Sequence, residues 1–240
     1  MIFSFFYHLF VSIYNINSNH DNVSPLIIYC SLEIQMKKSL LLMAMMSTSV
    51  FAGTIDMKIV GALDGPLAGG LPKMIEVYVI NDIPDLTLFG IGSANNGGGT
   101  DGQEFTFPAG SATAGTFLYL ASEAPMFTTY FGFAPDYTDG AASINGDDAI
   151  ELFQNGNVVD IYGDINVDGT GTAWDHLDSF AHRNNGTGPD GSTFVLGNWT
   201  VTAPNTLDSC STTNDACEGE GGATYPLALV PVELMNFSVE

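Results

Sequence analysis

Residues 164–175 carry oxygen-bearing side chains at a spacing that suits a hard cation. Asp164, Asn166 and Asp168 stand at alternate positions and a glycine follows them. Asp175 is the twelfth residue counted from Asp164, so the stretch matches the calcium-loop pattern with Asp in place of the usual final Glu. The sequence therefore predicts calcium as a candidate cofactor, held by these four side chains.

The same loop has a second interpretation that needs no metal. Asp and Asn side chains hydrogen-bond their own backbone in turns, and a predicted strand enters this loop where an EF-hand would have a helix. The adjacent pair Asp147-Asp148 is open to the same two interpretations, a further cation site or ordinary loop content.

Catalytic chemistry is poorly represented. His176 and His182 are the histidines that follow residue 52, and the chain has no G-x-S-x-G elbow to support a hydrolytic triad. A metal-dependent nuclease would need more histidines and more cations than this chain offers. Trp174 and Trp199 suggest either a sugar-stacking platform, which would make this a carbohydrate-binding module, or core packing, which is the commoner role of Trp in a sandwich. We expect a non-enzymatic protein.

Three further residues favour structural roles. Cys210 and Cys217 form an even pair in a chain with export signals, which predicts a disulfide. Two thiols without a neighbouring histidine do not make a zinc site. Arg183 is a lone cation in a predicted strand, and we expect it to form a structural ion pair with Glu76 or with an acid near Asp160.

The sequence has short runs of strand-forming residues between clusters of Gly, Pro, Asn and Asp. We expect these predicted strands to position the side chains described above. Residues 149–154 and 157–162 flank Asn155-Gly156, which is typical of a β-hairpin. Residues 124–131 could form a helical turn. This spacing predicts an all-β sandwich or barrel. The predicted strands are residues 55–60, 74–81, 87–92, 103–107, 116–121, 149–154, 157–162, 179–183 and 198–200.

The start of the chain carries an export signal. Met36-Lys37-Lys38 precedes an apolar run and a small-x-small cleavage pattern before Gly53, so residues 36–52 are predicted to be a bacterial signal peptide. Residues 1–35 are predicted to be a non-native upstream extension, with translation beginning at Met36. The alternative is a membrane-anchored form, although neither apolar stretch reaches the ~20 residues of a bilayer span. We expect a secreted or cell-surface location and no membrane span in the mature chain.

Charge limits the partners. The formal net charge is -22, and the only bases after residue 52 are Lys58, Lys73 and Arg183. Such a surface repels phosphate backbones, so direct nucleic acid binding is disfavoured.

The predicted organisation is a β-sandwich over residues 53–208, followed by a disulfide loop, a Gly-rich linker and an apolar tail over 209–240. The tail is either a terminal strand or a sorting segment.

Eight blocks follow one another in the chain: residues 76–78, 131–136, 145–149, 160–174, 178–183, 186–190, 198–200 and 205–208. Together they resemble the lamin-tail domain of secreted bacterial proteins. They cover most of residues 55–208 in the family's order, and the resemblance implies an immunoglobulin-like β-sandwich. His182 and Phe180 depart mildly from the residues that are commoner in the family.

The resemblance also implies a function. Lamin-tail domains look like interaction or tethering modules, and they often accompany extracellular nucleases. We expect a monomeric adhesion, tethering or scaffold module that binds a protein or a polysaccharide at the cell surface. The alternatives are an accessory module of a secreted nuclease or other hydrolase, and a carbohydrate-binding module.

Overall fold

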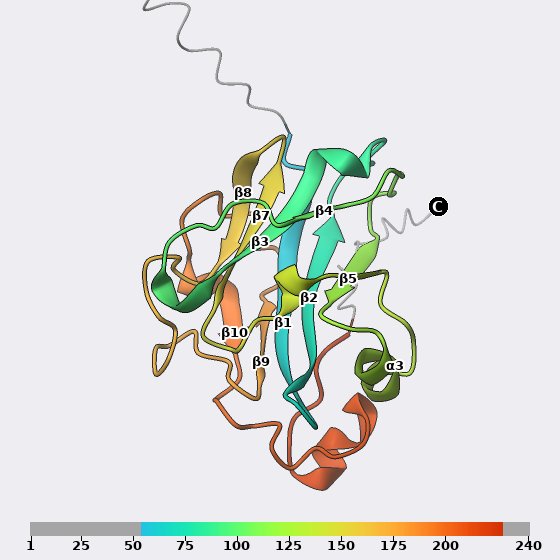
Figure 1. The fold of residues 1–240 in the computed structure, drawn as a ribbon, viewed down its shortest axis with the longest axis vertical. Coiled ribbons are helices and arrows are strands. Elements are labelled where there is room, and N and C mark those ends of the chain that lie inside the picture. The colour runs from blue at the N-terminus through green and yellow to red at the C-terminus, as the bar shows by residue number, and fades with distance from the viewer. Residues whose placement is uncertain (1–53, 228–240) are drawn as a thin grey trace, which may run out of the picture. The chain divides into compact units, whose positions relative to one another are not determined.

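A computed structural model describes residues 54–227, and these form a sandwich of two β-sheets (Figure 1). The predictions on residues 1–53 and on the tail from 228 onward lie outside the described part of the chain. The two-sheet arrangement confirms the all-β sandwich expected from the short, alternating strands. All nine predicted strands are present. Their ends differ from the predicted ones by up to three residues, except that the first strand ends at Leu67 and not at Val60.

The larger sheet has six strands in the order β10-β9-β1-β2-β5-β6. Neighbouring strands are antiparallel except β5 and β6, which are parallel. Strand β6 was not predicted, because two residues are too few to show alternation. The strands are β1 (Met57–Leu67), β2 (Leu71–Val79), β5 (Phe117–Ala121), β6 (Tyr137–Thr138), β9 (Phe180–Arg183) and β10 (Trp199–Val201).

The smaller sheet has four antiparallel strands in the order β4-β3-β7-β8. Its hairpin β7–β8 turns at Asn155-Gly156, where both residues have positive φ, as the Asn-Gly signal predicted. The strands are β3 (Phe89–Ala94), β4 (Phe105–Thr106), β7 (Ala149–Gln154) and β8 (Asn157–Tyr162).

The main core lies between the two sheets. Alternation in each strand sends one set of side chains into this layer, including Ile59 and Val77 from the larger sheet and Ile91 and Leu152 from the smaller one. Several 3-10 turns close the loops around it. They are η1 (Leu86–Leu88), η2 (Asn95–Gly97), η3 (Gly140–Ala142), η4 (Leu196–Asn198) and η5 (Asn214–Glu220).

A second core lies on the outer face of the larger sheet. Helix α3 (Pro125–Phe131), which matches the predicted helical turn, places Phe127 and Tyr130 there. Figure 1 shows α3 and η5 together at one end of the molecule. Within residues 54–227, no helix combines the length and the apolar character needed to cross a bilayer.

The second core corrects the predicted domain boundary at residue 208. Cys210 and Cys217 are joined by the predicted disulfide, and both are buried in this core. Tyr225, which follows the Gly-rich segment, is also buried there. The compact body therefore continues past residue 208 to at least Tyr225, because the disulfide loop supplies apolar side chains that cover the sheet.

Candidate functional site

The carboxylates of the predicted calcium loop bind nearby backbone amides. Asp164 Oδ1 accepts from the Asn166 N–H and Asp168 Oδ1 from the Thr170 N–H, both at 2.9 Å. Asp175 is nearly buried, and its two oxygens accept from the N–H groups of two further residues, Gly171 at 2.7 Å and Leu177 at 3.0 Å. These hydrogen bonds are the ones expected if the Asp and Asn side chains form turns with their own backbone, which is the interpretation that needs no metal. Residues 54–227 contain no cluster of three or more His, Cys, Asp or Glu side chains arranged to hold a metal.

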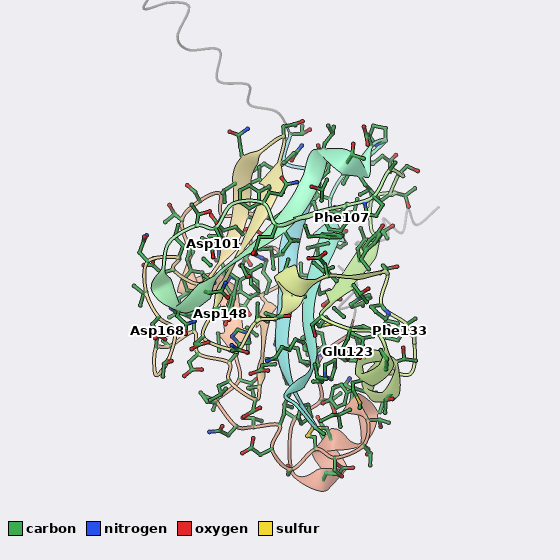
Figure 2. The ribbon with its side chains drawn as sticks, in the orientation of Figure 1. Asp101, Phe107, Glu123, Phe133, Asp148 and Asp168 are labelled. Carbon is green, nitrogen blue, oxygen red and sulfur yellow. A yellow bond between two sulfur atoms is a disulfide. The ribbon has the colours of Figure 1, made fainter. Side chains whose placement is uncertain are left out.

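The neighbouring pair Asp147-Asp148 ties the loops together. Asp148 is fully buried and accepts from the N–H groups of Asn96 and Asn145, each at 3.0 Å. Asp147 accepts from the Thr170 hydroxyl at 3.1 Å. Figure 2 shows Asp168 at the outer edge of this loop region and Asp148 deeper inside it. Asp148 therefore satisfies backbone donors of two loops and Asp147 accepts from a hydroxyl of a third, so the pair has a structural role in holding three loops.

Arg183 forms a buried ion pair, but its main partner is not Glu76. Its Nη2 lies 2.8 and 2.7 Å from the two carboxylate oxygens of Asp160, and its Nη1 lies 2.6 Å from Asp190 Oδ2. The guanidinium also stacks 4.4 Å from the Trp199 ring centroid. The expectation of an acid near Asp160 is confirmed, and the pairing with Glu76 is wrong because Glu76 points to the opposite face of the larger sheet.

Glu76 instead accepts a hydrogen bond from the far end of the chain. The Tyr225 hydroxyl donates to Glu76 Oε2 at 2.6 Å, and both residues are buried. Gly61 lies beside them, and a Cβ at Gly61 would overlap the Tyr225 hydroxyl. The glycine therefore makes room for the ring that closes this end of the molecule.

The two tryptophans are core residues and do not form a sugar platform. Trp174 is 5 % and Trp199 6 % exposed, and both pack against Tyr162 between the sheets. A sugar ring could reach neither. The interpretation of these residues as a binding platform is wrong, and the alternative of core packing is confirmed.

The two histidines lie in different environments. His176 is fully buried, its Nδ1 lies 3.3 Å from the Tyr162 hydroxyl, and burial lowers its pKa to about 4. His182 is half-buried on the outer face of β9, and burial lowers its pKa as well. His176 cannot meet a substrate, so a hydrolytic triad built on it has no access.

A groove of about 460 Å³ lies on the outer face of the larger sheet. That volume is in the range of small-molecule sites. Its floor comes from β1, β2, β5 and β9, and its rim from the loop after β9. The lining residues are Lys58, Val60, Glu76, Tyr78, Phe117, His182, Arg183, Asn184, Asn185, Gly186 and Pro226.

Strand register brings the central groove residues into one row. Lys58 pairs with Tyr78, and Tyr78 pairs with Phe117 on the next strand. The Tyr78 and Phe117 rings are 5.0 Å apart, and Lys58 Nζ lies 5.7 Å from the Tyr78 ring centroid. All three side chains are half-buried. The row therefore offers a ligand an aromatic surface with a cation beside it.

Polar groups flank this row. Lys58 Nζ donates one hydrogen bond to the Thr187 carbonyl at 2.9 Å, which leaves two of its three donors for a ligand. Burial, followed by the charge of Arg183, lowers the pKa of Lys58. The side chains of Asn184 and Asn185 lie at the rim. Aromatic faces combined with a few amide and ammonium donors suit a sugar, which presents C–H groups on its faces and hydroxyls at its edge.

Sequence reasoning missed this groove. The available signal was strand alternation, because Lys58 and Val60 in β1 and Tyr78 in β2 interrupt runs of buried apolar residues. The alternation shows that these side chains share a face of their own strand. It does not show that β9 and β5 bring His182 and Phe117 to the same face.

The chain was similar to no known protein in three comparisons. The chain matched no protein-family model, no curated protein and no solved structure.

Proposed function

We propose that this chain is an exported, non-enzymatic β-sandwich module of the immunoglobulin-like, lamin-tail type that acts in adhesion or tethering. Its recognition surface is the groove on the outer face of the six-stranded sheet, and its partner is a polysaccharide at the cell surface. The observation that carries the proposal is the row of Lys58, Tyr78 and Phe117 across three strands.

Two further observations support a binding role. The row stands on regular strands of a packed sandwich, so the groove is held in shape before a ligand arrives, which reduces the cost of ordering on binding. The strongly acidic composition favours a neutral or weakly charged polysaccharide over nucleic acid.

Affinity electrophoresis tests this function. The chain is run through gels that contain neutral, anionic or cationic polysaccharides, and its retardation gives the affinity for each. We expect retardation in at least one gel and binding about tenfold weaker for Tyr78→Ala, a loss of ~1.4 kcal/mol. Leu88→Ala is the matched control, because Leu88 is an exposed apolar residue beside the smaller sheet.

Two results of this assay would contradict the proposed polysaccharide site. If no gel retards the chain, or if Tyr78→Ala and Leu88→Ala are retarded as strongly as the parent, the groove is not a polysaccharide site. Near-ultraviolet circular dichroism of each variant shows that the core aromatic residues keep their packing.

A further inference from the structure

The groove on the outer face of the six-stranded sheet concentrates positive charge in an acidic chain. Lys58, Lys73 and Arg183 are the only bases after residue 52, and two of them, Lys58 and Arg183, line the groove. Glu76 is the single acidic residue that the described part of the chain contributes to the lining. The formal net charge of the whole chain is -22, so the sign of the charge is locally reversed here. Charge complementarity of this kind selects among ligands.

Two of the three charged lining residues are already bound inside the protein. The Arg183 guanidinium binds the carboxylates of Asp160 and Asp190. Glu76 accepts the hydrogen bond from the Tyr225 hydroxyl. Both side chains are buried. Lys58 is therefore the charged group of the lining whose donors can reach a ligand.

The Lys58 ammonium has little compensation from the described residues. The ion pairs found in residues 54–227 do not include it, and its hydrogen bond goes to a neutral acceptor, the Thr187 carbonyl, at 2.9 Å. Burial and then the charge of Arg183 lower the pKa of Lys58, and the charges of Asp160 and Asp190 act against them. An anion placed beside this ammonium would offset the cost of its burial.

The row of aromatic rings favours an anion that is part of a sugar. Lys58 Nζ lies 5.7 Å from the Tyr78 ring centroid, and the Phe117 ring is 5.0 Å further along the row. A sugar ring that stacks on Tyr78 would therefore bring its edge to the ammonium. A uronate carries a carboxylate at that edge. Its two oxygens suit the two donors that Lys58 has left, and its single charge matches the single ammonium.

We propose that the groove recognises a uronate within an otherwise neutral polysaccharide, with the sugar ring on Tyr78 and its carboxylate on the Lys58 ammonium. This inference rests on the proposed function and names its substrate class. The neighbouring sugars should be neutral because the net charge of the chain repels a polymer with a carboxylate on every sugar. A single carboxylate is affected mainly by charges within ~8 Å at physiological ionic strength.

Pairs of polymers that share one backbone test the carboxylate. Polygalacturonate is used fully methyl-esterified, which removes every charge, and partly esterified, which leaves scattered carboxylates. Xylan with glucuronate side chains is compared with its carboxyl-reduced form, and sulfated dextran is the anion of a different kind. Affinity electrophoresis gives the affinity for each. We expect the chain to bind the uronate member of at least one pair about tenfold more tightly than its neutral partner.

Two variants assign this preference to Lys58. Lys58→Met removes the ammonium, and we expect it to bind both members of the pair with the parental affinity for the neutral member. Lys58→Arg keeps the positive charge, and we expect it to keep the preference for the uronate. Parental binding of the neutral polymer by Lys58→Met shows that the variant is folded and that the aromatic row is intact.

The results separate this inference from the proposed function. Equal affinity for both members of each pair, binding of neutral polymers only, or a preference for sulfated dextran over the uronates overturns the uronate and leaves a polysaccharide site. A preference that survives in Lys58→Met places the carboxylate elsewhere and also overturns the inference. Binding of no polymer removes the proposed function and this inference with it.

Acetylation of Lys58 distinguishes an open groove from a closed one. Acetic anhydride is added to the full chain, and peptide mass spectrometry follows Lys58, with Lys73, which is paired with Asp64, as the internal reference. We expect Lys58 to react without ligand. An oligomer of the preferred uronate polymer at ~10 times Kd should slow this reaction about tenfold, because about a tenth of the sites stay free, and should leave Lys73 unchanged.

Two acetylation results would overturn the inference. If Lys58 does not react in the chain without ligand, its ammonium is closed off from the groove and cannot receive a carboxylate. If Lys58 reacts equally fast with and without the oligomer while the gel shows binding, the uronate is bound at another place.

Discussion

Arg183 and Asp160 join the two sheets of the sandwich through a buried ion pair. Arg183 lies on β9 of the larger sheet and Asp160 on β8 of the smaller one, and their side chains are 1 % and 0 % exposed. Arg183 Nε also donates to the Ile59 carbonyl at 2.6 Å, and Asp160 accepts from the Ile59 N–H at 2.8 Å. The pair therefore also satisfies the backbone of β1 at the sheet interface.

Removal of one partner of this ion pair should lower the free energy of unfolding strongly. Asp160→Ala leaves a buried guanidinium with less compensation, and we expect the free energy of unfolding to fall by about 3–5 kcal/mol. The double variant Asp160→Leu, Arg183→Met should lose much less, because no buried charge remains. Urea denaturation measures both, with the exposed Asp208→Ala as a control that shifts by less than about 0.5 kcal/mol.

Equal losses for Asp160→Ala and for the double variant would contradict this account. They would mean that side-chain shape at the sheet interface, and not charge compensation, sets the cost.

Gly61 is required by Tyr225. A methyl group at Gly61 would overlap the Tyr225 hydroxyl, so Gly61→Ala should displace the ring and lower the free energy of unfolding by about 1–3 kcal/mol. Tyr225→Phe removes the hydroxyl and part of the overlap. We therefore expect the double variant to lose less than the sum of the two single losses, because the residues are in contact. Additive losses in denaturant titrations would show that the two sites are independent.

The fold was predictable where its signals are local. The β7–β8 hairpin follows from alternating side chains around Asn155-Gly156, and the short-range disulfide follows from two nearby cysteines in an exported chain. The partners of Glu76 and Arg183 were harder, because Tyr225 lies 149 residues from Glu76 and strand order decides which acid faces Arg183.

The sites were less predictable than the fold. Spacing alone cannot separate a calcium loop from a turn, because both need Asp and Asn at alternate positions, and only side-chain direction distinguishes them. The groove depends on β9 pairing with β1 across more than 100 residues, which places His182 on the same face as Lys58.

The 164–175 loop makes a prediction about calcium. Its carboxylates already accept backbone N–H groups, so we expect the melting temperature in 1 mM calcium to equal that in EDTA within about 1 °C. A calcium site filled at ~100 times Kd would add ~2.7 kcal/mol and raise the midpoint by about 2–4 °C. A rise of that size that Asp168→Ala abolishes would establish the calcium site and overturn the turn interpretation.

His176 should make stability depend on pH. Its pKa is about 4 in the folded chain because of burial, and its ordinary value is ~6.5. Because the folded pKa is depressed, the neutral form is favoured by folding, and this contribution is present above the unfolded pKa and lost as the pH falls toward 4. Between pH 7.5 and pH 5 the loss amounts to about 2 kcal/mol.

The comparison of the parent with His176→Gln isolates this contribution. Burial raises the pKa of Asp64, Asp148 and Asp160, which act in the opposite direction, but both chains share them. We therefore expect the stability difference between the two chains, measured by urea denaturation, to shrink by about 2 kcal/mol from pH 7.5 to pH 5. A difference that stays constant over this range would mean that His176 titrates alike in the folded and unfolded chain, and that its burial does not exclude the charged form.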